Sequence, residues 1–230
     1  MLFDLTHTFE DGMPGFTMRG ADGRAVGLTA SIQPFLTHEQ SRSLYQGKAS
    51  FEITELRFQT SVGTYVDSPR HRFAGRRDVS ELELDELVLE GVVVHVPDAR
   101  AGEPIGLARM RMPNDVRGKA VLFRFDWDRY WGTDAYDAYP HIARDVIDHL
   151  VSGGAKLVGV DTINADDRTD PERPCHTCLL DNDILIVENL AHLSVLPPFG
   201  FRFFAIPIKA RGAATMPIRA FAEVADAAAP

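Results

Sequence analysis

The sequence predicts an α/β fold with a mixed sheet, flanking helices and more strand than helix. Short apolar runs recur from residue 91 onward, and the second of them, at residues 119–125, is followed by a helical pattern and then by another run. A strand, a helix and a strand joined by a short return form a βαβ unit, whose two strands are parallel. The remaining runs add strands to the same sheet.

The first half of the chain contains loops and then a strand. Residues 10–48 are rich in Gly, Pro, Ser and Thr, so we expect long surface loops that leave room for short strands. Loops of this length often bind or cover a ligand. Residues 51–59 then alternate with a period of two and include β-branched and aromatic residues, which indicates a strand.

The βαβ unit begins with a strand at residues 119–125, whose nearly continuous apolar run predicts burial on both faces. Pro140 opens the predicted helix and Gly153 closes it. Its apolar residues have helical spacing: Ile142, Ala143, Val146, Ile147, Leu150 and Val151. Further strands are predicted at residues 91–96, 156–161, 184–188 and 202–209, and the Ala-rich tail, 225–230, is expected to fray.

Composition excludes several classes of partner. The chain has 24 Lys and Arg against 33 Asp and Glu, a net charge of −9, which argues against nucleic acid. No apolar stretch reaches the roughly 18 residues of a membrane span. The first residues lack the basic region of a signal peptide, and two cysteines do not make a disulfide framework. We therefore expect a cytoplasmic protein without a nucleic-acid or membrane partner.

The first segment that suggests chemistry is residues 61–71. Asp67 and His71 lie four positions apart after a strand, and Pro69 stiffens the chain between them. Rigid ligands lose less entropy when an ion binds. On spacing alone this is a weak signal, and an ordinary surface loop explains it as well.

The second segment contains His176 and Glu188. Glu188 ends an apolar strand, where a carboxylate is costly to desolvate unless it pairs with an arginine or binds a cation. Strand ends of this kind are also where ligands collect in parallel sheets. His176 lies within Cys-His-Thr-Cys at 175–178, but no second Cys/His pair completes a structural zinc site.

These segments resemble the metal-dependent cyclase family, which includes bacterial kynurenine formamidase and isatin hydrolase. Gly63, Thr64, Asp67, Pro69 and His71 match its hallmark motif His-x-Gly-Thr-His-x-Asp-x-Pro-x-His. Further matches lie at residues 4–7, 12–14, 127–136, 158–162, 176–180, 187–190, 205–209 and 217–220. The resemblance implies one domain over residues 1–230 with a swivelling β/β/α fold. It also implies a homodimer or homotetramer whose N-terminal loops reach a neighbour's site.

The resemblance also implies a ligand set, and two positions depart from it. Ser61 and Tyr65 stand where the family has two histidines that hold one ion. Serine is a poor ligand, and tyrosine binds well only as a phenolate. The ligands that the family uses for its other ion are all present: Asp67, His71, His176 and Glu188. We expect one divalent ion, zinc or manganese, or none if the loss of two ligands has emptied the site.

Three functions remain open from the sequence. The first is metal-assisted hydrolysis of an amide, cyclic amide or lactone, with Glu188 or His71 as general base and Tyr65 donating to the oxyanion. The second is a cyclisation, dehydration or isomerisation, without an ion, in which His71 and Glu188 act as an acid/base pair and Tyr65 as an acid. The third is a non-catalytic ligand-binding derivative of an enzyme.

Overall fold

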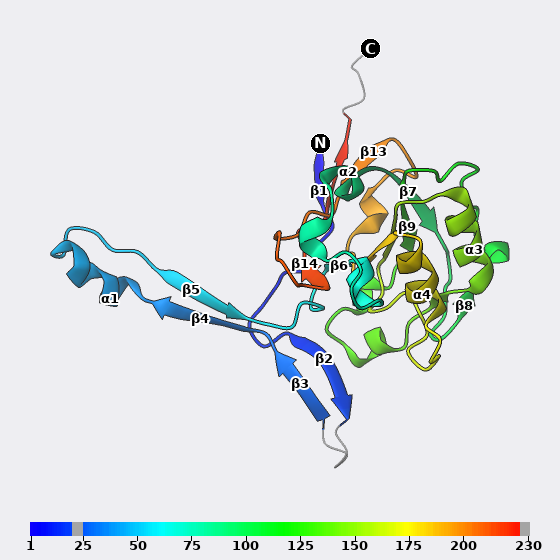
Figure 1. Ribbon diagram of the computed structural model, residues 1–230. Helices are drawn as coiled ribbons and strands as arrows, with labels where there is room; N and C mark the ends of the chain where they lie inside the picture. Colours follow the sequence, from blue (N-terminus) through cyan, green and yellow to red (C-terminus); the bar gives the residue numbers. More distant parts are fainter. Residues whose placement is uncertain (20–24, 226–230) are drawn as a thin grey trace. The chain divides into compact units, whose positions relative to one another are not determined.

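The computed structural model describes residues 1–19 and 25–225, and it divides the chain into two compact units (Figure 1). The first unit joins Met1–His7 to the chain from Thr64 onward, and the second is Thr8–Gly63. The predicted frayed tail lies outside the described residues except for Ala225.

The first unit is built on a nine-stranded mixed sheet, which confirms the predicted fold class. Its strand order is β1-β15-β13-β7-β9-β11-β12-β6-β14. The four central strands are parallel to one another. They are β7 (Val88–His95), β9 (Ala120–Arg124), β11 (Leu157–Val160) and β12 (Leu185–Glu188). Antiparallel strands flank them: β1 (Leu2–Asp4), β15 (Phe221–Val224), β13 (Phe201–Phe204), β6 (Tyr65–Asp67) and β14 (Thr215–Pro217).

The central strands are buried on both faces, as the apolar run at residues 119–125 predicts. In β9, Val121 and Phe123 pack into one hydrophobic cluster, whereas Ala120 and Leu122 pack into another. Because side chains alternate along a strand, the two clusters lie on opposite faces of the sheet. Gly159 of β11 leaves room for this packing, because a Cβ at this position would lie only 2.6 Å from the side chain of Leu122.

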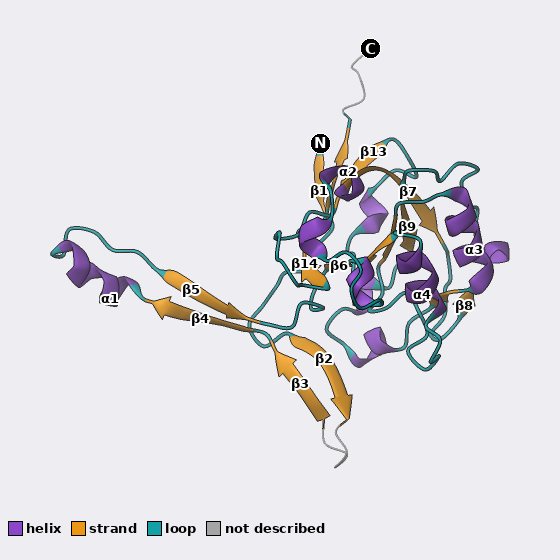
Figure 2. Ribbon diagram, in the orientation of Figure 1, coloured by secondary structure: helices purple, strands orange, loops and turns teal. Residues whose placement is uncertain are grey.

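Helices α3 (Arg144–Gly153) and α4 (Pro174–Asp181) pack side by side against one face of the sheet (Figure 2). The short helix α2 (Leu84–Leu87) precedes β7. In the described ranges no helix is long and apolar enough to cross a membrane.

Two predicted boundaries were wrong. The helix predicted from Pro140 begins at Arg144, because residues before it form strand β10 (His141–Ile142), which pairs with β8 (Pro104–Ile105). The strand predicted over residues 202–209 ends at Phe204, and Pro207 beyond it has no N–H to donate to a ladder.

In its described residues, the second unit contains two β-hairpins, the short helix α1 and a 3-10 turn at Ser43–Tyr45. Strands β2 (Pro14–Arg19) and β3 (Ala25–Thr29) form one hairpin, and β4 (Ser31–Leu36) and β5 (Ile53–Arg57) form the other. Helix α1 (His38–Arg42) lies at the tip of the second hairpin (Figure 1). The strand predicted at residues 51–59 is confirmed, but it pairs with β4 and is exposed along its whole length.

We predict that Leu150→Ala lowers the free energy of unfolding by about 2–5 kcal/mol. Leu150 lies on the buried face of α3 with no exposed surface, so the truncation leaves a cavity under the helix. Denaturant unfolding followed by circular dichroism measures the change. Ser152→Ala, on the exposed side of α3, is the matched control and is expected to change the stability by less than about 0.5 kcal/mol. Equal stability losses in both variants would contradict this packing.

Candidate metal centre

Three of the predicted site residues come together at one edge of the sheet. Asp67 ends β6, His71 ends the 3-10 turn that follows it, and His176 lies in the first turns of α4. One potential ligand atom from each residue lies within 4.8 Å of the other two. A carboxylate and two imidazoles at this separation form a set that can hold a divalent cation.

The pairing of β6 with β12 determines which side chains face this edge. The two strands are antiparallel, with Tyr65 opposite Glu188 and Asp67 opposite Ile186. Residues two apart on a strand share a face, and so do residues directly opposite each other. Ile186 belongs to the hydrophobic cluster that also contains Leu179 and Leu180 of α4. Tyr65, Asp67 and Glu188 therefore point toward α4, which brings His176.

The surroundings of the Asp67 carboxylate favour the binding of a cation. Asp67 is fully buried, and neither of its oxygens has a hydrogen-bond partner among the described residues. Its nearest charged group is His176, whose Nε2 lies 3.6 Å from Oδ2. A buried carboxylate without donors costs several kcal/mol of desolvation unless a positive charge compensates it. A divalent ion held by Asp67, His71 and His176 would supply that charge.

Glu188 lies beside these three residues and is held by several donors. Its Oε1 accepts the backbone N–H of Ala165 at 2.8 Å and lies 3.4 Å from Nε2 of His176. Its Oε2 accepts from the Tyr65 hydroxyl and, at 3.5 Å, from the Asn164 amide. Within the described chain Glu188 does not pair with an arginine. Burial raises its pKa above the ordinary value, against the effect of His176. Its role as a fourth ligand stays a prediction.

Tyr65 is a phenol rather than a phenolate. Burial, followed by the neighbouring charges of Glu188 and Asp67, raises the pKa of Tyr65 well above 10. Its single hydroxyl proton is donated to Glu188. The other altered position, Ser61, belongs to the second compact unit. Tyr65 therefore orients Glu188, and its predicted hydrogen bond to a reaction intermediate is untested.

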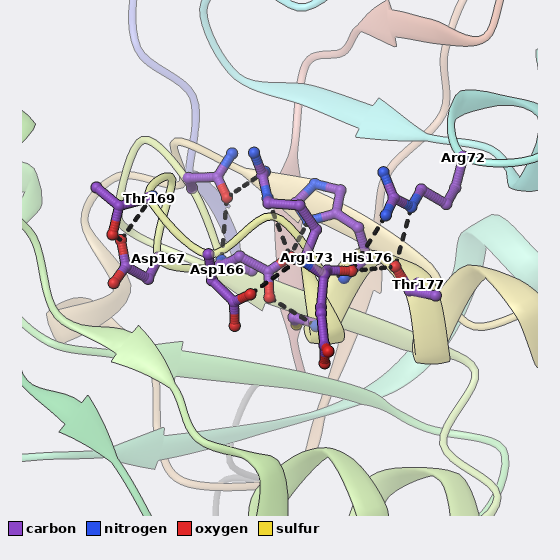
Figure 3. Close-up of polar contacts among 12 residues, drawn as sticks. Arg72, Asp166, Asp167, Thr169, Arg173, His176 and Thr177 are labelled. Carbon is purple, nitrogen blue, oxygen red and sulfur yellow. Dashed lines mark hydrogen bonds and ion pairs between the residues drawn. The ribbon is translucent and has the colours of Figure 1, made fainter.

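The sequence reasoning missed Asp166, which contacts His176 directly (Figure 3). Oδ2 of Asp166 lies 2.7 Å from Nδ1 of His176. Burial alone would lower the pKa of His176, but Asp166 together with Asp67 and Glu188 raises it to about 10. A signal was present, because Asp166 follows the parallel strand β11, whose carboxyl end lies at the ligand-binding edge of the sheet.

Arg76 and Arg77 could bind a substrate carboxylate and the aromatic residues of 127–136 could line a pocket, although a solvated turn and ordinary core packing explain them at least as well. Arg76 pairs with Asp181 and Asp183, and Arg77 pairs with Glu86 and Asp183. Four aromatic side chains pack into the core or against it: Trp127, Tyr130, Trp131 and Tyr136. These contacts are structural.

This geometry agrees with the comparisons with known proteins. The model of the Cyclase family, described as "Putative cyclase", matches residues 3–167. The chain belongs to this family, which confirms the resemblance inferred from the hallmark motif.

Relatives of known name agree with this assignment. The chain is 30% identical to kynurenine formamidase of Salinibacter ruber over 176 residues, 76% of this chain and 81% of that protein. It is 29% identical to Cyclase-like protein 3 of Oryza sativa subsp. japonica over 227 residues, 95% of this chain and 78% of that protein. Isatin hydrolase A of Labrenzia aggregata superposes with a TM-score of 0.80 at 20% identity, covering 98% of this chain and 94% of its own. That likeness supports the fold.

We predict that zinc or manganese stabilises the wild-type chain and does not stabilise Asp67→Asn. An ion at 100 times its Kd adds about 2.7 kcal/mol, or roughly 5–10 °C in Tm for a chain of this size. Thermal melts with and without the ion measure the shift. Asp181→Asn, an exposed carboxylate on α4, is the control and should shift as the wild type does. An equal shift in the Asp67 variant would show that the ion binds elsewhere.

Proposed function

We propose that this chain is a metal-dependent hydrolase of an amide, cyclic amide or lactone bond in a small molecule. The observation that carries the proposal is Asp67, a buried carboxylate without hydrogen-bond donors that faces two imidazoles. The relative named kynurenine formamidase supports an amide as the bond that is cleaved. Zinc is the first candidate ion and manganese the second, because the donors are two nitrogens and a carboxylate.

The site is open on one side, which suits catalysis better than a purely structural role. Asp67 and His176 are buried, whereas His71 is exposed. Three protein ligands leave a coordination position for water or substrate. A divalent ion held there would lower the pKa of a water molecule and polarise the substrate carbonyl.

Glu188 is the general base in this proposal. Each carboxylate oxygen has two lone pairs, so Oε1 can take the proton of the attacking water while it keeps the N–H of Ala165. The pKa of Glu188, raised by burial, makes it a stronger base than an exposed carboxylate. Glu188 then returns the proton to the leaving nitrogen or oxygen, so hydrolysis balances without another reactant. Tyr65 holds the carboxylate in place through Oε2.

We predict that Glu188→Gln lowers kcat by about 10²–10⁴-fold, because an amide cannot accept the proton. The assay uses N-formyl aromatic amines, cyclic amides and lactones with the zinc-loaded protein. Glu223→Gln, an exposed carboxylate on β15, is the control. Full activity of the Glu188 variant would rule out this base.

We predict that Tyr65→Phe shifts the acid limb of the pH–rate profile to higher pH. The hydroxyl stabilises the ionised form of Glu188, so its loss raises the pKa of this base further. The ionised base is then present only at higher pH, and activity below neutrality falls more than activity at pH 9. The profile of kcat against pH measures the shift. An unchanged profile, or one displaced to lower pH, would contradict the contact.

Removing the ion separates hydrolysis from the second candidate function. Under the present proposal, exhaustive chelation abolishes turnover and added zinc or manganese restores it. Activity that survives chelation favours a cyclisation or isomerisation in which His71 and Glu188 transfer protons without an ion. Binding of a substrate with no turnover favours the non-catalytic derivative.

We also propose that the chain forms a homodimer or homotetramer in the cytoplasm, where its two free cysteines stay reduced. The hairpin of β4 and β5 exposes large apolar side chains: Phe35, Leu44, Ile53 and Leu56. Apolar surface gathered on one hairpin is typical of an interface. Light scattering should give at least twice the chain mass of 25.5 kDa. The pair Ile53→Glu and Leu56→Glu should reduce it to one chain, and a monomeric wild type would contradict the proposal.

A further inference from the structure

Asp166 is a buried carboxylate that contacts both the ring and the backbone of His176 (Figure 3). Its Oδ2 lies 2.7 Å from Nδ1 of the His176 ring and accepts the backbone N–H of the same residue at 3.0 Å. Its Oδ1 accepts the N–H of Cys175 at 2.6 Å. One carboxylate thus holds the first turn of α4 and the imidazole that projects from it.

The helix depends on this carboxylate because its own first residue does not cap it. Arg173, at the N-cap position of α4, has a left-handed backbone with φ of 48° and makes no side-chain cap. The unpaired N–H groups at the start of a helix need acceptors, and Asp166 supplies them from a distant loop. The position of His176 is thereby fixed relative to strand β11, which precedes Asp166 in the chain.

The contact also determines which nitrogen of His176 faces the site. A carboxylate accepts, so Nδ1 carries the proton in the neutral ring and Nε2 keeps its lone pair. Nε2 lies 3.6 Å from Oδ2 of Asp67 and 3.4 Å from Oε1 of Glu188. We propose that Asp166 is a positioning residue that holds His176 with its Nε2 lone pair directed at the metal centre, an inference that rests on the proposed function.

The loop that carries Asp166 is itself tied to the site. Oδ1 of Asn164 accepts the N–H of Asp166 at 3.0 Å and a guanidinium N–H of Arg173 at 2.8 Å. The neighbouring Ala165 donates to Glu188. The same short loop therefore orients the histidine ligand and the proposed base. Carboxylates in this position behind a ligating histidine typically contribute 10–100-fold to metal affinity.

The test measures zinc affinity by competition with a chromophoric chelator. We expect Asp166→Asn, which keeps the volume and loses the charge, to weaken zinc binding by about 10–100-fold. Asp166→Ala should weaken it at least as much. Asp167→Asn is the matched control, because the adjacent Asp167 caps a turn at Thr169 and should leave the affinity unchanged.

A second readout keeps the inference testable if Asp166→Ala fails to fold. Nitrogen-15 NMR of the zinc-loaded wild type should find the proton of His176 on Nδ1, hydrogen-bonded, with Nε2 free of a proton. Wild-type affinity in Asp166→Asn, or a proton on Nε2, would overturn the inference and leave the hydrolase proposal intact. A wild type that takes up no zinc would overturn both.

Discussion

The burial of three carboxylates at one edge of the sheet constrains the rest of the site. Asp67, Asp166 and Glu188 are all essentially inaccessible to solvent. The chain compensates two of them with its own donors: backbone N–H groups of α4 for Asp166, and Tyr65 with Ala165 for Glu188. Asp67 receives no such donor among the described residues. Its compensation has to come from a positive charge, which a protonated His176 or a metal ion provides.

This division of donors separates the carboxylates by role. A carboxylate that accepts several hydrogen bonds is held in one orientation and loses little when an ion leaves. A carboxylate without donors is free to ligate but is costly when the ion is absent. Asp67 is of the second kind and Glu188 of the first, which favours Asp67 as ligand and Glu188 as base. The same carboxylates raise the pKa of His176 to about 10, so binding of an ion there would release a proton.

Much of the fold and part of the site could be predicted from the sequence. The apolar run at residues 119–125 predicted a strand buried on both faces, because consecutive apolar residues place apolar side chains on both faces of a strand. Asp67, His71 and His176 were identified through the resemblance to the family, although His176 lies 105 positions after His71. Asp166 was missed because its importance comes from its contacts with α4, whose N-cap residue makes no side-chain cap, and its place after β11 does not by itself indicate those contacts. Strand β5 could be predicted from its alternating pattern. Its pairing with β4 in a separate unit could not, because alternation indicates a strand but not its partner.

Tyr65 bears on the interpretation of the site through the contact that its hydroxyl makes. Its side chain does not simply fill space beside the sheet. Instead its hydroxyl lies opposite Glu188 in the strand register and donates to the carboxylate. A phenylalanine would fill the same volume without leaving a polar group to satisfy. A tyrosine here suits a Glu188 that must stay oriented and ionised, which the proposed role of Glu188 as a base requires. The hydroxyl of Tyr65 is therefore better explained as a donor that supports the proposed base than as a group that only fills space.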